Sequence, residues 1–243
     1  MPALLELLGI PYTGSDPTAI ALSLDKGLAK RLVHQVGLLT PAFVLMATGK
    51  ERLPKGWGFP AIVKPVAEGS SRGVTDKSVV QDEAALRRVV PEMAARYRQP
   101  MLVEAFLPGR EFTLGLLARR GELHVLPPLE VVFTDPNERH PVYGFDNKFY
   151  SKGVDLQVPA RVEPALLAEL SRVAKAAFET LGCRDVGRVD VRLDASGRVS
   201  FIECNPLPGL TPDFSDLCVI AKADGLDYHA LIGAILAGAL ARR

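Results

Sequence analysis

Apolar residues recur at the three- and four-residue spacing of an amphipathic helix in several parts of the chain. The clearest example begins at Glu163 and Pro164 and ends before Gly182, a residue suited to the left-handed turn that follows many helices. The same pattern predicts a helix at 3–8 and another that opens at residue 16, which residues 25–36 either continue or restart. It also predicts a helix at 82–95 with a kink at Pro91, and two helices after residue 212.

Short apolar runs bounded by turn residues predict strands between these helices. Pro127 and Pro128 interrupt one run, which indicates a sheet edge or a bulge. Residues 134–155 are polar and aromatic and show no period, a composition more typical of a functional lid than of a simple connection. The expected strands are 42–46, 61–64, 101–104, 111–117, 123–133, 187–193 and the return strand that ends at 205.

The last two strands form the predicted hairpin around which the chain is organised. Strand side chains alternate between faces, so Arg188 and Asp190 share one face, and Glu203 and Asn205 share one on the return strand. If residues 194–197 form the loop, Arg188 lies opposite Glu203 and Asp190 is the diagonal neighbour of Glu203. Two carboxylates, an amide and a guanidinium therefore converge.

Two interpretations of this polar face stay open. Carboxylates about 4 Å apart repel by about 4 kcal/mol at an effective dielectric near 20, so a cation must lie between them. Arg188 alone could supply that charge in a salt-bridged hairpin. Asn205 adds nothing to an ion pair but is a good oxygen ligand, which favours a hard cation such as Mg²⁺.

Composition and charge exclude several classes of protein. The net charge is +1 and the basic pairs are scattered, so no footprint for nucleic acid or an anionic membrane is visible. Three cysteines without CxxC spacing indicate free thiols in a reducing compartment. No secretory signal is visible, and the apolar run 230–240 is too short to cross a bilayer. A cytoplasmic location is therefore expected.

Two further stretches are candidates for nucleotide contacts. Lys64 ends a strand before residues 67–74, whose glycines and serines could close over phosphate oxygens or form an ordinary hairpin turn. No GxxxxGK[ST] motif occurs, so a P-loop is excluded as the phosphate site. The segment 104–111 carries Phe106 and Leu107, which could receive a flat heterocycle or belong to a β-bridge with solvated acids.

Taken together, five ordered blocks give the chain a family resemblance. They are 64–65 with 68–74, 102–104 with 109–113, 187–190, 203–211, and the N-terminal pair 7–15 and 25–26. In order and spacing the chain resembles the ATP-grasp ligases, and within them the D-alanine–D-alanine ligase group. The resemblance implies an α+β fold with two α/β subdomains, 25–106 and 107–243, and the nucleotide between two antiparallel sheets. Residues 1–24 would be the remnant or linker of a missing N-terminal domain.

The resemblance also implies a set of site residues. ATP would be bound by Lys26, Lys64 and Lys148 at the phosphates, Glu104, Phe106 and the backbone of Ala105 and Leu107 at the adenine, and Glu111 at the ribose. Two Mg²⁺ ions, or Mn²⁺ in their place, would be held by Asp190, Glu203 and Asn205. Catalytic groups would be Arg188 and the N–H of Gly209 at the oxyanion, Ser70 at the substrate amine, and Lys148 closing over the phosphates.

The implied reaction is ATP-dependent formation of a dipeptide through an acyl-phosphate, as in peptidoglycan biosynthesis. Its partners would be small amino acids and a second copy of the chain. Two departures bear on the substrate: Phe149 stands where the family often has tyrosine, with Tyr150 next, and residues 212–216 differ from the usual segment. The alternatives are a ligase for another amino acid or peptide, or a catalytically incomplete Mg-ATP-binding module.

Overall fold

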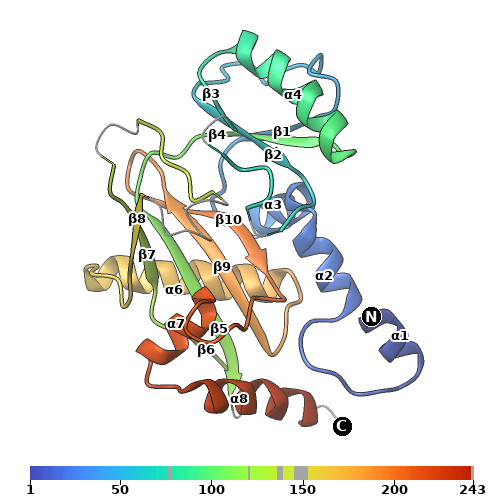
Figure 1. Ribbon diagram of the computed structural model, residues 1–243, viewed down its shortest axis with the longest axis vertical. Coiled ribbons are helices and arrows are strands. Elements are labelled where there is room, and N and C mark those ends of the chain that lie inside the picture. Colours follow the sequence, from blue (N-terminus) through green and yellow to red (C-terminus); the bar gives the residue numbers. More distant parts are fainter. Residues whose placement is uncertain (70, 76–77, 120, 136–138, 145–152, 242–243) are drawn as a thin grey trace.

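The structure is a computed structural model that describes residues 1–69, 71–75, 78–119, 121–135, 139–144 and 153–241. Two antiparallel sheets and their covering helices make up the protein (Figure 1). The helices are α1 (Pro2–Leu7), α2 (Pro17–Leu24), α3 (Lys26–Gln35), α4 (Glu83–Tyr97), α6 (Pro164–Thr180), α7 (Asp216–Ala223) and α8 (Tyr228–Leu240).

The smaller sheet has the strand order β1-β4-β2-β3. Its strands are β1 (Phe43–Met46), β2 (Ala61–Pro65), β3 (Val79–Val80) and β4 (Met101–Ala105). Helix α4 packs on it, and Leu86 and Val90 of this helix are fully buried against Val63 and Val103. The helix continues through Pro91, where the sequence predicts a kink.

The larger sheet has the order β10-β9-β5-β7-β8, with β6 paired to β5. Its strands are β5 (Glu111–Arg119), β6 (Glu122–Val125), β7 (Leu129–Phe133), β8 (Val154–Gln157), β9 (Val186–Leu193) and β10 (Val199–Asn205). Helix α6 lies along one face of this sheet (Figure 1), and a second apolar cluster joins the sheet to α7 and α8.

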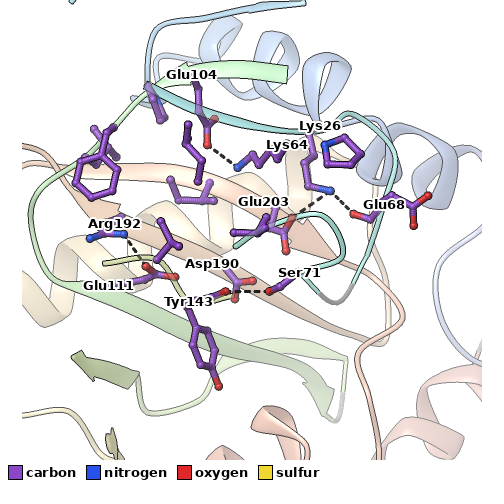
Figure 2. Close-up of a pocket in the computed structure, with 18 of the residues that line it drawn as sticks. Lys26, Lys64, Glu68, Ser71, Glu104, Glu111, Tyr143, Asp190, Arg192 and Glu203 are labelled. Carbon is purple, nitrogen blue, oxygen red and sulfur yellow. Dashed lines mark hydrogen bonds and ion pairs between the residues drawn. The ribbon is translucent and has the colours of Figure 1, made fainter. Parts of the chain in front are cut away.

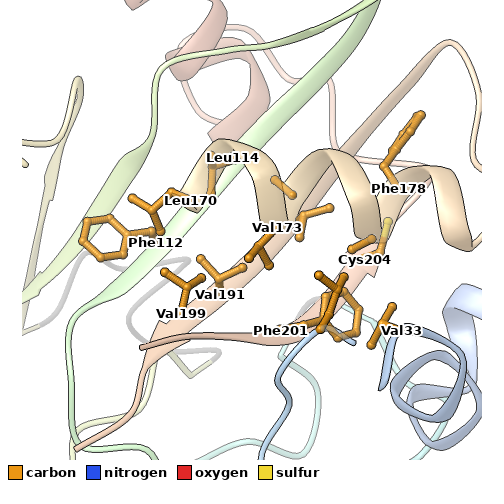
Figure 3. Close-up of a cluster of buried hydrophobic side chains, with 14 of the residues drawn as sticks. Val33, Phe112, Leu114, Leu170, Val173, Phe178, Val191, Val199, Phe201 and Cys204 are labelled. Carbon is orange, nitrogen blue, oxygen red and sulfur yellow. The ribbon is translucent and has the colours of Figure 1, made fainter. Parts of the chain in front are cut away.

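The main core lies between α6 and the larger sheet (Figure 3). Leu170 and Val173 of the helix meet Val191 and Phe201 of the hairpin strands there. Every residue of β9 is buried, including the charged ones on the opposite face. Buried charges need partners, so the polar face of β9 must be paired from neighbouring elements.

The hairpin register differs from the expected one. Arg188 lies opposite Asn205, and Asp190 lies directly opposite Glu203. Two one-residue shifts produce this register: Val199, instead of Arg198, pairs with Leu193, and a bulge follows Phe201. One shift alone would turn Glu203 to the core face; the bulge restores the shared face because side chains alternate along a strand.

Other elements refine the expected boundaries. The helix opened by Asp16 ends at Leu24 and a new one starts at Lys26, because the Asp25 side chain accepts the N–H of Leu28 as an N-cap. The predicted strand 123–133 is two strands, broken at Pro127 and Pro128. Strands β3 and β8 were not predicted, since one is two residues long and the other ends the long polar segment.

The described helices include none that is both long enough and apolar enough to cross a lipid bilayer.

Gly187 is required by the packing of β9 against α6, which gives a stability prediction. A Cβ at this position would lie 2.5 Å from Cε2 of Phe178, in the buried core. Gly187→Ala should therefore lower the free energy of unfolding by about 1–3 kcal/mol, measured by urea denaturation. The control is Gly233→Ala in α8, where a Cβ would meet nothing within 4 Å. Equal stability of the two variants would contradict this packing.

Candidate functional site

A cavity lies between the two sheets (Figure 2). Strands β2 and β4 form one wall and β9 and β10 the other. The described residues of the Gly- and Ser-containing loop, 67–69 and 71–74, also contribute to the lining, as do Val142 and Tyr143. Nine of the residues predicted to bind nucleotide or metal line it: Lys26, Lys64, Glu104, Ala105, Phe106, Leu107, Glu111, Asp190 and Glu203.

Glu104 lies between two lysines on the wall formed by the smaller sheet. One carboxylate oxygen is 2.5 Å from Nζ of Lys64 and the other is 3.0 Å from Nζ of Lys30. Burial alone would raise the pKa of Glu104, but the two ammonium groups hold it below its ordinary value. Burial would lower the pKa of Lys64, yet Glu104 and Glu203 raise it. Both groups therefore stay charged at neutral pH.

Lys30 is fully buried, and the sequence reasoning missed it. Its Nζ also donates to Oγ1 of Thr40 and to the carbonyl of Phe201, beside the bulge of β10. Burial lowers the pKa of Lys30 to about 8, against the attraction of Glu104. Lys30 thus links α3 to both sheets. Its spacing of four residues from Lys26, which places both on one helix face, is the signal that could have found it.

Lys26 connects the helix to the opposite wall of the cavity (Figure 2). Its Nζ is 3.3 Å from a carboxylate oxygen of Glu203 and also donates to the carbonyl of Glu68 in the loop 67–74. The N–H of Lys26 donates to the carbonyl of Val66, which fixes the start of α3 against the end of β2. A single ammonium group therefore bridges the loop and the hairpin.

The carboxylates of the hairpin meet on the cavity side as the sequence predicts, although with a different pairing. The amide nitrogen of Asn205 lies 3.3 Å from an oxygen of Asp190 and 3.3 Å from an oxygen of Glu203. Asp190 also accepts a hydrogen bond of 2.9 Å from Oγ1 of Thr113 on β5. The amide of Asn205 is thus within hydrogen-bond distance of both carboxylates.

Arg188 contacts this group through Asp190 but is not among the residues that line the cavity. Its guanidinium forms a bidentate pair with Asp190 at 3.0 and 2.9 Å and a third bond to Asp216 at 2.8 Å. These carboxylates raise the pKa of Arg188 although burial alone would lower it. Arg188 and Asp216 thereby hold Asp190 in place, and the contribution of Asp216 was not predicted from the sequence.

Arg192 lines the cavity and was not predicted as a site residue. Its Nη1 donates to Glu111 at 3.0 Å and to the carbonyl of Pro141 at 3.0 Å, and its Nε donates to the carbonyl of Gly109. The guanidinium lies 4.8 Å from the ring centroid of Phe106. The sequence places Arg192 on the face of Asp190 but gives no sign that it reaches Glu111 on the adjacent strand.

The two segments singled out as closing loops meet over the cavity. Oγ of Ser71 donates to the carbonyl of Tyr143 at 3.0 Å (Figure 2). Both residues line the cavity. Four residues with an expected role in the site lie outside the described residues: Ser70, Lys148, Phe149 and Tyr150.

Of the predicted site residues that the structure describes, Asn205 and Gly209 also do not line the cavity. Gly209 is in the exposed loop after β10, packed so closely on Ser215 that a Cβ would come within 2.7 Å of Oγ. Oγ of Ser215 accepts the N–H of Thr211 and so holds the loop. A Cβ at residue 209 would push Oγ of Ser215 from this position and so disturb its hydrogen bond with Thr211.

Comparison with known proteins relates this arrangement to one family. The family described as "D-ala D-ala ligase C-terminus" matches residues 32–237. D-alanine–D-alanine ligase of Bordetella petrii is 38% identical over 237 residues, which are 97% of this chain and 70% of that protein. The ligase of Pseudomonas putida is 37% identical, over 100% of this chain and 73% of that protein.

Solved structures show the same likeness. D-alanine–D-alanine ligase from Bacillus anthracis, complexed with ATP, superposes with a TM-score of 0.77 and 25% identity, covering 98% of this chain and 73% of that one. VanG D-Ala:D-Ser ligase from Enterococcus faecalis gives a TM-score of 0.83 and 26% identity, covering 98% and 68%. The architecture of the two sheets is therefore that of these ATP-grasp enzymes.

Proposed function

Because the chain belongs to the D-alanine–D-alanine ligase family, we propose that it joins two D-alanine molecules in an ATP-dependent reaction that proceeds through an acyl-phosphate. The observation that carries this proposal is the convergence of nine predicted nucleotide and metal residues on one cavity between the sheets. The product would be a dipeptide for peptidoglycan biosynthesis. We further propose a cytoplasmic location, which three free thiols support.

The cavity residues suit a nucleotide. Glu104 lines the cavity beside Ala105 and Phe106, and its carboxylate would accept a hydrogen bond from the amino group of an adenine. The N–H of Ala105 already donates to Ala42, which leaves the carbonyl of Ala105 and the N–H of Leu107 as the proposed backbone contacts. Lys26 and Lys64 would bind the phosphates and Phe106 would pack on the base.

The hairpin residues suit Mg²⁺. Asp190 and Glu203 present carboxylate oxygens, the ligand type that Mg²⁺ prefers. Asn205, whose amide nitrogen here donates to both carboxylates, would turn its oxygen toward the ion, and the remaining positions would go to phosphate oxygens and water. Among the described residues no group of three or more His, Cys, Asp or Glu side chains is arranged to hold a metal ion by itself. Bound here, Mg²⁺ would neutralise charge on the transferring phosphoryl group.

The residues of the chain contribute positioning and charge. A carboxylate is a poor electrophile, and conversion to an acyl-phosphate gives it a leaving group that an amine can displace. Lys26 and Lys64 would neutralise phosphate charge, and the proposed oxyanion donors are Arg188 and the N–H of Gly209. Arg188 would act mainly by its charge, because three of its nitrogens already donate to carboxylates. We assign Lys148 to the phosphates and Ser70 to the substrate amine.

We also propose that the chain is divided into two subdomains, 25–106 and 107–243, and that residues 1–24 lead into the first. We also propose that the chain forms a homodimer. Exposed leucines on and beside α1 support this, since Leu7 is 82% and Leu8 59% exposed.

A turnover assay tests the proposed function. The protein is incubated with ATP, Mg²⁺ and a panel that includes D-alanine, D-serine and L-alanine, and phosphate release is measured. D-alanine-stimulated phosphate release together with D-alanyl-D-alanine, identified by mass spectrometry, is the expected result. Phosphate release only with another amino acid would show that D-alanine is not the substrate. Nucleotide binding without turnover would contradict ligase activity.

Arg192 should matter for ribose recognition, because it fixes the carboxylate of Glu111 that we assign to the ribose hydroxyls. Arg192→Met keeps an unbranched side chain beside Phe106 and removes the charge. We expect the KM for ATP to rise about 10-fold and the preference for ATP over 2′-deoxy-ATP to fall, with a smaller change in kcat.

Arg110→Met is the matched control for Arg192→Met. Arg110 forms a similar pair with Glu130 at 2.6 and 2.7 Å and lies 5.0 Å from the ring centroid of Phe112, but it does not line the cavity. This control should leave the ATP/2′-deoxy-ATP preference unchanged. An equal loss of preference in both variants would show that Arg192 acts only through the stability of the sheet.

A further inference from the structure

Two cysteines lie side by side on the core face of the larger sheet, although they are 21 positions apart in the sequence. The Sγ atoms of Cys183 and Cys204 are 3.8 Å apart, and both thiols are free. Cys183 follows the end of α6, and Cys204 belongs to β10. The proposed ligase chemistry uses neither thiol, so their proximity has no role in the site described above.

The two thiols differ in access. Cys183 is half-buried and lines a groove of about 710 Å³, together with Phe178 and Arg184 on one side and Ala237 of α8 on the other. Cys204 is 3% exposed and packs in the core with Phe178. A small molecule in the groove therefore meets Cys183 first, and Cys204 stands behind it.

The surroundings of Cys183 favour its thiolate. Its Sγ is within 3.6 Å of Oγ of Ser23 as well as near Cys204. Hydrogen bonding from Cys204, with a smaller contribution from Ser23, lowers the pKa of the Cys183 thiol, although burial opposes this shift. A thiolate is the form that attacks a disulfide, so Cys183 is the suited nucleophile and Cys204 the resolving thiol.

Cys204 also lies between two proposed magnesium ligands. Because side chains alternate along a strand, Cys204 faces α6 while Glu203 and Asn205 face the opposite side. A disulfide needs its sulfur atoms about 2.05 Å apart, so the pair must close by more than 1 Å. Among the described strands, β10 lies at the edge of its sheet and pairs with β9, and closure of the two sulfur atoms would move Cys204 within it.

We propose that Cys183 and Cys204 form an oxidation site for a low-molecular-weight disulfide, and that their linkage displaces the residues of β10 that we assign to magnesium. The Cys183 thiolate attacks one sulfur of the oxidant, breaks its S–S bond and releases one thiol. Cys204 then attacks the Cys183 sulfur and releases the second thiol. The protein loses two electrons and two protons, which reduce the oxidant to two thiols.

The test uses the full chain treated with glutathione disulfide and then freed of reagent. We expect the free thiols to fall from three to one, a peptide that links Cys183 to Cys204, and a loss of Mg-dependent activity of about 10- to 100-fold that dithiothreitol reverses. Cys218→Ser is the matched control and should respond like the native chain. Cys183→Ser should form no link and keep its activity under the same treatment.

The effect on activity rests on the proposed function, but the linkage does not. Absence of the linked peptide would overturn the proposal, and so would a linked protein with full activity. Equal inactivation of Cys183→Ser would overturn it as well. If the reduced protein shows no ligase activity, the proposed function fails instead, while thiol counting and the linked peptide still decide whether the two cysteines react.

Discussion

Glu203→Gln and Asp190→Asn should each reduce ligase turnover by about 100- to 1,000-fold while the protein stays folded. Both side chains present carboxylate oxygens at the hairpin, and the amide substitution removes the negative charge that would hold Mg²⁺. Glutamine preserves the size of Glu203, whose side chain is 18% exposed. Asparagine keeps an acceptor for Arg188, which retains its bond to Asp216. Steady-state kinetics with circular dichroism measures both effects.

Asp155→Asn is the control for these two variants. Asp155 is an exposed carboxylate on β8 of the same sheet, and it does not line the cavity. Its substitution should leave kcat and KM for ATP near the native values. Native turnover in either Glu203→Gln or Asp190→Asn would rule out the metal assignment, because the carboxylate charge that we assign to Mg²⁺ would then not be needed for catalysis.

Arg188→Met should have the largest effect on stability. Arg188 neutralises Asp190 and Asp216, and all three residues are at most 9% exposed. Removing the guanidinium leaves two buried carboxylates without their cation, at a cost of about 3–5 kcal/mol. Since a domain is stable by only about 5–15 kcal/mol, we expect a large fall in the urea midpoint.

Arg198→Met is the matched control for Arg188→Met. Arg198 pairs with Asp194 at 2.8 Å in the same hairpin, but its side chain is 66% exposed. Exposed pairs contribute about 0–1 kcal/mol, so this variant should unfold close to the native midpoint. If both variants lose the same stability, Arg188 is not the buried cation that holds the polar face together.

Much of the site could be predicted from the sequence, because side-chain types and their spacing indicate where oxygen and nitrogen ligands cluster. Glu203 and Asn205 do share a face with Asp190, and Lys64 and Glu104 line one cavity as expected. The two antiparallel sheets agree with the ATP-grasp fold that the resemblance implied.

The register of the hairpin could not be predicted from its pattern alone. Alternation fixes which side chains share a face but does not reveal a bulge, and the bulge after Phe201 changes every pairing beyond it. The backbone of Phe201 is also bonded to residues outside the hairpin. Its carbonyl accepts hydrogen bonds from the side chains of Lys30 and Thr40, and the N–H of Phe201 donates to the carbonyl of Leu39.

The two unpredicted residues Lys30 and Arg192 have a related explanation. Lys30 and Arg192 reach the site through partners that are distant in the sequence, Glu104 and Glu111. A single sequence shows that such residues are charged but not that the fold buries them together. Their burial with a partner is what separates them from ordinary surface lysines and arginines.

Binding of Mn²⁺ in the presence of a non-hydrolysable ATP analogue tests most directly whether the hairpin carboxylates hold a metal beneath the nucleotide. The bound Mn²⁺ can be measured by electron paramagnetic resonance for the native chain and for Glu203→Gln. We expect the native protein to bind Mn²⁺ with nucleotide, and the variant to bind it about 10-fold or more weakly. Equal Mn²⁺ affinity in the two proteins would contradict the assignment of this site.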